Sequence, residues 1–205
     1  MKILCKYNVM PLILLSLLYS NRTNAQGKES NMMKHVQVNQ DGTIILTPSA
    51  SSSRTDFNFL MGKWKVENRK LRSRLSGSKE WDKFDSVLEL QEILLGIGNR
   101  ETFTATINGN PYEAVALRLF NPKTALWTDY WADSNEGTLD LHPVVGSFEG
   151  KVGSFFTRDE FKGKPIFVVY QWDYTIPEHP QWRQAYSEDN GKQWEWNWYM
   201  DLTKF

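Results

Sequence analysis

The residues best suited to acid–base chemistry surround one loop-like segment. Asp129, Tyr130 and Asp133 precede it and His142 follows it, and loops are common places for functional groups. His142 is the one group there whose ordinary pKa suits proton transfer near neutrality. We therefore predict His142 and Tyr130 as catalytic residues. The alternatives are a surface histidine in front of Pro143 and a tyrosine that only packs.

The segment 112–120 predicts a strand with two different faces. Ala114, Ala116 and Arg118 share one face, because successive residues of a strand point to opposite sides. The small side chains on this face predict a concave interior with room for a ligand, into which Arg118 points. The alternative is an exposed arginine on a half-solvated strand.

The last predicted strand, 193–203, leaves two interpretations open. Trp194, Trp196 and Trp198 share one face, and Glu195 and Asn197 share the other. Because aromatic rows are usually core, we expect Glu195 and Asn197 to point into the cavity as polar specificity groups. In the alternative, the tryptophans form a wall on which a flat ligand or a sugar ring stacks.

The familiar sequence signatures of several enzyme classes are absent. The three histidines, His35, His142 and His179, lie far apart and form no ligand spacing typical of a metal site. No phosphate-binding glycine loop, nucleophile elbow or dinucleotide-binding motif occurs. We expect no metal and no cofactor, although catalysis by acid–base groups alone stays open.

Residues 1–25 resemble a signal peptide. Lys2 and Lys6 give a positive start, Val9–Leu18 is apolar, and Thr23–Ala25 resembles a cleavage site. The apolar run is short for a membrane span, so we expect a periplasmic or secreted protein without a membrane span after cleavage. The alternative is an uncleaved anchor.

Charge and cysteine content limit the partners. The 205-residue chain has 24 basic and 24 acidic residues. Removing residues 1–25 takes away three basic residues and no acidic one, so the net charge becomes −3. That balance argues against nucleic acid, which needs a basic face. The single cysteine, Cys5, leaves with the signal, so we expect a core without disulfides.

The remaining chain predicts an all-β domain. Residues 26–55 form an arm or linker with a possible hairpin around Asp41-Gly42. Residues 56–205 contain about ten short strands, separated by turns such as Asn108-Gly109. Such spacing is typical of an antiparallel barrel or sandwich.

The start of this domain resembles that of lipocalins. Asp56–Gly62 can form a short helical turn that Asp56 caps, and Gly62-Lys63-Trp64 matches the family's Gly-x-Trp motif. The resemblance implies a lipocalin-like barrel of about ten antiparallel strands, with a short N-terminal helical plug on which the tryptophan packs. In lipocalins a late-strand arginine commonly covers this tryptophan, and Arg183 is the nearest candidate.

Five segments resemble an uncharacterised bacterial family with a lipocalin-like fold. They are 56–64, 117–122, 130–134, 143–148 and 182–187. The resemblance spans most of the chain after residue 55 and implies no agreed activity. Haem-binding relatives of this barrel use a histidine near the C-terminus, and this chain has none after His179.

The chain is also similar to secreted oligosaccharide dehydratases of bacteria that degrade ulvan-type polysaccharides. Removing water next to a uronic acid requires a base, an acid and a cation that holds the carboxylate. The resemblance implies that Arg118 or Arg183 clamps the carboxylate and that Trp131 or Trp172 stacks on the ring.

Three functional hypotheses follow. The first is a barrel that binds a small, carbohydrate-derived ligand, such as a uronate oligosaccharide, and eliminates water from it. The second is a non-catalytic carrier of an apolar or aromatic small molecule. The third is a structural protein with a filled barrel. The first predicts an open cavity with at least one arginine and two proton-transfer groups; the oligomeric state is left open.

Overall fold

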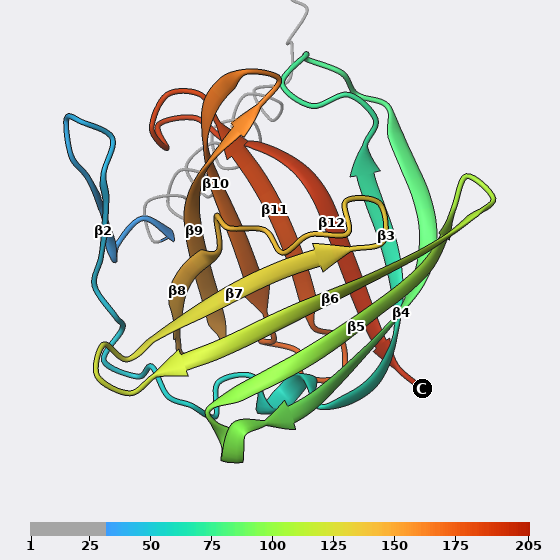
Figure 1. Ribbon diagram of the computed structural model, residues 1–205, viewed down its shortest axis with the longest axis horizontal. Coiled ribbons are helices and arrows are strands. Elements are labelled where there is room, and N and C mark those ends of the chain that lie inside the picture. Colours follow the sequence, from blue (N-terminus) through green and yellow to red (C-terminus); the bar gives the residue numbers. More distant parts are fainter. Residues whose placement is uncertain (1–31) are drawn as a thin grey trace, which may run out of the picture. The chain divides into compact units, whose positions relative to one another are not determined.

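The computed structural model describes residues 32–205, and His35–Phe205 form one compact unit. The expected signal peptide, residues 1–25, lies outside the described residues. Ten strands of this unit close into a single antiparallel barrel (Figure 1). The prediction of an all-β antiparallel barrel with about ten strands is therefore confirmed.

The barrel strands follow the chain as a meander. They are β3 (Gly62–Leu71), β4 (Trp81–Ile93), β5 (Gly98–Ile107), β6 (Asn110–Asn121), β7 (Leu126–Asp133), β8 (Val144–Glu149), β9 (Val152–Phe161), β10 (Lys164–Asp173), β11 (Gln181–Ser187) and β12 (Glu195–Lys204). Each strand pairs with the next, and β12 pairs with β3 to close the barrel. Asn108 and Gly109 both have positive φ, as a tight hairpin turn between β5 and β6 requires.

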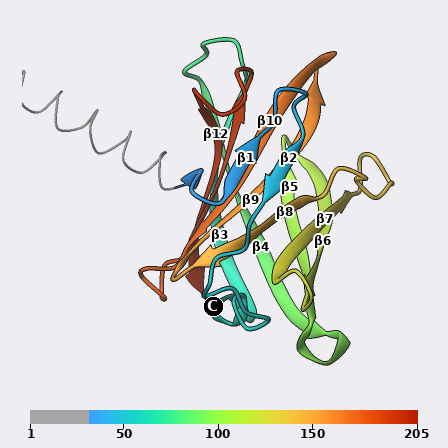
Figure 2. The same ribbon diagram turned by 90° about the vertical axis from the view of Figure 1, so that its left-hand side faces the viewer.

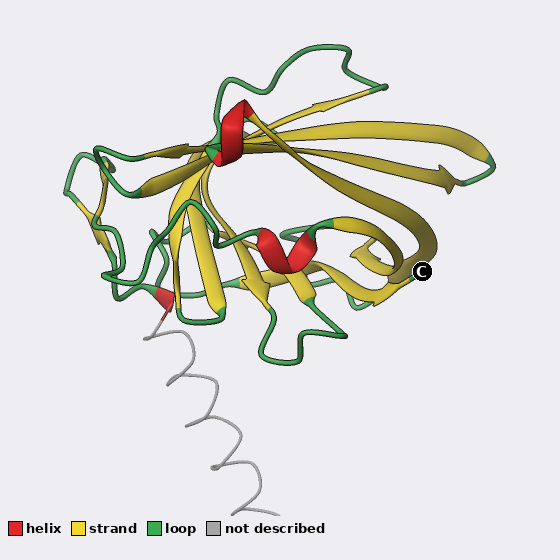
Figure 3. Ribbon diagram, turned by 90° about the horizontal axis from the view of Figure 1, so that it is seen from below, coloured by secondary structure: helices red, strands yellow, loops and turns green. Residues whose placement is uncertain are grey.

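A single 3₁₀ turn, η1 (Asn58–Leu60), stands where the helical plug was expected. It lies at the lower end of the barrel in Figure 1 and is red in Figure 3. Within His35–Phe205 the structure contains two 3₁₀ turns, η1 and η2 (Leu94–Gly96), and no α-helix. Asp56 does not cap η1; its carboxylate accepts hydrogen bonds from the Ser53 backbone and the Trp127 indole.

The residues of η1 still organise the core. Phe57 is 1% exposed and packs edge-on against Trp127 and Phe148, with ring centroids 5.0 and 5.1 Å away. The Trp64 indole donates to the Leu60 carbonyl at 2.8 Å. Lys204, and not an arginine, covers the Trp64 ring, with Nζ 4.9 Å from its centroid.

A small hairpin precedes the barrel. It consists of β1 (Val36–Val38) and β2 (Ile44–Leu46) and lies beside β9 in Figure 2. Arg158 of β9 donates from Nε to the Gly42 carbonyl at 2.9 Å. The Ser49 backbone donates to Ser147 Oγ of β8 at 3.0 Å.

Gly146 fixes the close approach of β8 to β9. A Cβ at this position would lie 2.0 Å from the Ser154 carbonyl oxygen, a backbone atom that cannot move aside without its strand. We therefore expect Gly146→Ala to lower the free energy of unfolding by roughly 3 kcal/mol or more in urea denaturation. Gly150→Ala is the control. Gly150 has a positive φ, but a Cβ there would meet no other atom within 4 Å, so we expect a loss of only about 1 kcal/mol in the free energy of unfolding. Equal losses would contradict the steric explanation.

Candidate functional site

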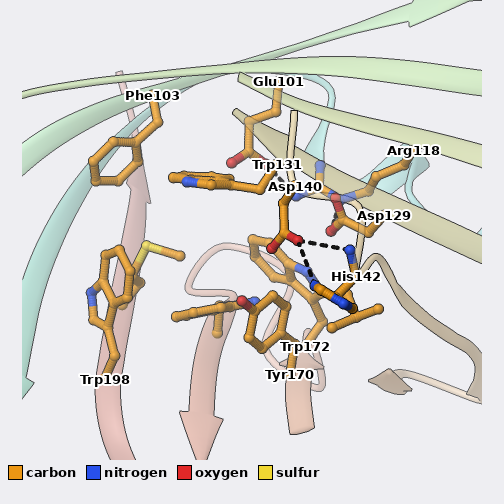
Figure 4. Close-up of a pocket in the computed structure, with 13 residues that line it drawn as sticks. Glu101, Phe103, Arg118, Asp129, Trp131, Asp140, His142, Tyr170, Trp172 and Trp198 are labelled. Carbon is orange, nitrogen blue, oxygen red and sulfur yellow. Dashed lines mark hydrogen bonds and ion pairs between the residues drawn. The ribbon is translucent and has the colours of Figure 1, made fainter. Parts of the chain in front are cut away.

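The barrel encloses a cavity of about 80 Å³. This is several times the roughly 10–15 Å³ that one water molecule requires. Its lining combines charged groups, six aromatic rings and two aliphatic side chains. The lining residues are Glu101, Phe103, Arg118, Asp129, Trp131, Asp140, His142, Val144, Tyr170, Trp172, Trp182, Trp198 and Met200. Figure 4 shows Phe103 and Trp198 on one side of the cavity and Arg118 and Asp129 on the other.

Three adjacent strands supply the charged side. Arg118 of β6 pairs in register with Asn99 of β5 and with Asp129 of β7. Its Nε donates to Asp129 Oδ2 at 2.8 Å, and Nη1 donates to Asn99 Oδ1 at 3.4 Å. Nη2 forms an ion pair with Glu101 Oε2 at 2.7 Å. Arg118 and Glu101 are only 3% and 2% exposed.

Burial and pairing set the protonation of this cluster. Burial opposes the charge of Arg118, but Asp129 and Glu101 outweigh it and raise the pKa of the guanidinium. The pKa of Asp129 is raised to about 6, because burial and the nearby Glu101 together outweigh the attraction of Arg118. Arg118 therefore stays charged and already has two carboxylate partners, whereas Asp129 exchanges a proton close to neutral pH.

The opposite side is an aromatic wall with fixed geometry. Trp198 meets Trp182 edge-on at 5.4 Å and Phe103 edge-on at 6.4 Å. The indole N–H of Trp198 donates to Asn68, and that of Trp131 donates to Asp133. Because these polar edges already have partners, the rings are left with apolar faces for packing or stacking. Burial raises the pKa of Tyr170 well above its ordinary value, so its hydroxyl stays neutral.

His142 and Asp140 lie at the mouth of the cavity, in the loop between β7 and β8. The His142 backbone donates to Asp140 Oδ1 at 2.7 Å, and its Nδ1 lies 3.7 Å from the same oxygen (Figure 4). The His142 side chain is 66% exposed. The imidazole therefore faces solvent beside a carboxylate at the entrance of the cavity.

Four of the predicted site residues line the cavity: His142, Arg118, Trp131 and Trp172. Tyr130 does not line the cavity. In β7, Asp129 and Trp131 point inward, so the alternation of the strand turns Tyr130 to the outer face.

Arg183 also lies outside the cavity. Its neighbour Trp182 faces the cavity, and strand alternation turns Arg183 to the outer face of β11. There its Nε donates to Gln171 Oε1 at 2.8 Å, and its guanidinium covers the Trp196 ring at 4.1 Å. A carboxylate clamp at this position is therefore not part of the cavity.

A β-bulge overturns the expected faces of the last strand. Gln184 pairs with Trp198, but the next residue, Ala185, pairs with Trp196, so Asn197 is an extra residue. The bulge turns Trp198 into the cavity, while Trp196 stays outside. The tryptophan row therefore belongs to two faces of the sheet.

The two polar groups expected in the cavity have partners within the protein instead. Asn197 is completely buried and accepts a hydrogen bond from the Gln184 side chain at 2.8 Å. Glu195 accepts a hydrogen bond from the Leu75 backbone at 2.7 Å. Neither residue lines the cavity, so their assignment as ligand-binding groups is not supported by their positions.

Sequence reasoning missed several lining residues, above all Glu101. A signal was present: Glu101 alternates with the polar Arg100 and Thr102 and shares a face with the apolar Phe103. A lone acid on the apolar face of a strand indicates a buried partner or a site. The aromatic residues Tyr170, Trp182 and Trp198 carried no separate signal, because core aromatics have the same pattern.

The sequence was also compared with models of known protein families and with curated protein sequences, and neither comparison finds a match. Among residues 32–205, no helix has the length and apolar character needed to cross a membrane. The same residues contain no group of three or more histidine, cysteine, aspartate or glutamate side chains arranged for a metal ion.

Proposed function

We propose that the protein binds a small, ring-shaped, hydroxyl-rich ligand of carbohydrate type inside the barrel. The observation that carries the proposal is the Glu101 carboxylate, which lines the cavity. Its Oε2 is buried and lies 2.7 Å from Arg118 Nη2, and no other donor among the described residues reaches it. A carboxylate oxygen can accept more than one hydrogen bond, and a ligand hydroxyl is a suitable second donor.

The aromatic wall supports a ring as the body of the ligand. Trp131, Trp172 and Trp198 line the same space as the carboxylates, so a sugar ring packed against them can point its hydroxyls toward Glu101 and Asp129. A carrier of purely apolar molecules fits less well, because its ligand would offer no hydrogen bond to the carboxylates that line the cavity. The presence of a cavity also makes the third hypothesis, a structural protein with a filled barrel, less suitable.

The binding proposal is tested by tryptophan fluorescence titration with saturated and unsaturated uronate oligosaccharides. Trp131→Leu is expected to weaken binding about tenfold, as the loss of one stacking face implies. Trp196→Leu removes a tryptophan from the outer face and is expected to leave the affinity within twofold of wild type. Equal effects of both variants, or no saturable binding by wild type, would reject the proposed site.

Elimination of water is a second candidate, favoured by the pKa of Asp129 at about 6 and by His142 at the mouth. A base takes the proton next to the carboxylate, the C–H electron pair forms the C=C bond, and the hydroxyl leaves as water with a proton from an acid. We assign the base to His142 and the acid to Asp129. Mass spectrometry should show the loss of one water, abolished in His142→Ala and Asp129→Asn; loss that persists in both variants would reject these roles.

A further inference from the structure

A second pocket of about 280 Å³ lies between the start of β4, the end of β5 and the segment after β3. It shares no lining residue with the aromatic cavity. Its charged lining residues are Lys70, Arg72, Arg74, Asp82 and Lys83, so four cations face one carboxylate. This excess of positive charge contrasts with the aromatic cavity, where carboxylates outnumber the single arginine.

The one carboxylate of this pocket is already engaged. Arg72 donates from Nε and Nη2 to Asp82 Oδ1 at 2.9 and 2.8 Å, and from Nη1 to Glu80 Oε2 at 2.9 Å. Lys70 and Arg74 have no carboxylate within ion-pair distance among residues 32–205. Arg74 donates from Nη1 to the Tyr186 hydroxyl at 2.7 Å, and its guanidinium lies 5.3 and 5.4 Å from the ring centroids of Phe161 and Tyr186.

Lys70 of this pocket contacts Trp198 of the aromatic cavity. Its Nζ lies 3.8 Å from the ring centroid of Trp198, and Trp198 is a wall of the cavity. Trp198 therefore lies between the cavity and Lys70, so the two spaces are close enough for neighbouring units of one ligand.

The charges around Lys70 favour the arrival of an anion. Burial and the positive charge of Arg74 lower the pKa of Lys70 to about 8, against the opposing charge of Asp133. The Trp198 ring attracts the ammonium form, but a ring carries no net charge and cannot neutralise two neighbouring cations. A carboxylate or sulfate between Lys70 and Arg74 would neutralise their repulsion and form charge-assisted hydrogen bonds.

We infer that Lys70 and Arg74 form an anion-binding subsite. It takes the carboxylate or sulfate of the oligosaccharide unit next to the one held in the aromatic cavity, and this second part rests on the function proposed above. The carboxylate of the ligand is thereby assigned to Lys70 and Arg74, which have no carboxylate within ion-pair distance among residues 32–205. Arg118 is already paired with Glu101 and Asp129.

The anion subsite is tested first with inorganic sulfate alone. Reductive methylation of the full-length protein at pH 8, followed by peptide mass spectrometry, reports the reactivity of each lysine. Sulfate is expected to slow modification of Lys70 at least threefold and to leave Lys204 unchanged, although Lys204 also lies on a tryptophan ring. In Arg74→Met the slowing of Lys70 modification by sulfate should be less than half of that in wild type. Equal slowing at Lys70 and Lys204, or no slowing at Lys70, would overturn the subsite.

The link to the oligosaccharide is tested with cellobiose and cellobiouronic acid, which differ by one carboxylate. Wild type is expected to bind the acid about tenfold more tightly, and Lys70→Met and Arg74→Met should remove this preference without weakening cellobiose. Lys204→Met is the matched control and should keep the preference. If both sugars bind and the preference survives in both subsite variants, the subsite is wrong while the proposed function stands. If neither sugar binds but sulfate protects Lys70, the proposed function fails and the anion site stands.

Discussion

Arg118→Met is expected to lower the free energy of unfolding by roughly 3–5 kcal/mol at neutral pH, because it leaves two buried carboxylates without their cation. Glu101 and Asp129 have ion-pair contacts of 2.7 and 2.8 Å with this arginine. Mutual repulsion then adds to their desolvation. The loss should shrink toward pH 4, where Asp129, whose pKa is raised by burial, can take up a proton. Urea denaturation at several pH values measures the effect.

Two further variants serve as controls for Arg118→Met. Arg100→Met removes the neighbouring exposed arginine of β5, which bonds to Gln91, and should change stability by less than about 0.5 kcal/mol. Adding Glu101→Gln and Asp129→Asn to Arg118→Met should restore part of the loss, since no unpaired charge remains buried. A loss below about 1 kcal/mol in Arg118→Met would show that the charged cluster is more solvated than its burial indicates.

The stability of Asp129→Asn relative to wild type is expected to depend on pH. The pKa of Asp129 is raised from 3.8 to about 6, so the folded protein binds this proton more tightly than the unfolded chain. The contribution of Asp129 to stability is therefore fully present below about pH 4 and is lost as pH rises through 6. The pKa difference corresponds to roughly 3 kcal/mol, by which Asp129→Asn should gain on wild type between pH 4 and 7.

Denaturant midpoints at half-unit intervals of pH measure this change. Asp85→Asn, at an exposed position of β4, controls for the loss of one negative charge from the protein. If the difference in free energy of unfolding between Asp129→Asn and wild type stays constant from pH 4 to 7, Asp129 titrates below this range.

The alternation of small and large side chains explains why the barrel and part of the site were predictable. In β6, Ala114 and Ala116 share a face with Arg118, and all three are at most 3% exposed. Period-two patterns carry such information directly. The same rule places Tyr130 and Arg183 on the outer face, because neighbouring residues of a strand point to opposite sides and Trp131 and Trp182 point inward.

Other features depend on interactions that no short pattern encodes. The bulge at Asn197 reverses the faces of the strand within an unbroken alternation of tryptophans, and it exists only relative to the partner strand β11. The partners of Arg118 come from two other strands, so their convergence depends on register. Lys70 of β3 and Arg74 of the segment after it share a pocket with residues of β4 and β5, so their convergence likewise depends on tertiary structure.

The most direct test of the account is the structure of a crystal soaked in cellobiouronic acid. We expect one sugar ring against Trp131 and Trp198, with a hydroxyl donating to Glu101 or Asp129, and the carboxylate beside Lys70. A cavity without a sugar ring, with the ligand bound at the outer tryptophan Trp196, would contradict the central claim that this barrel receives a ring-shaped ligand in its interior.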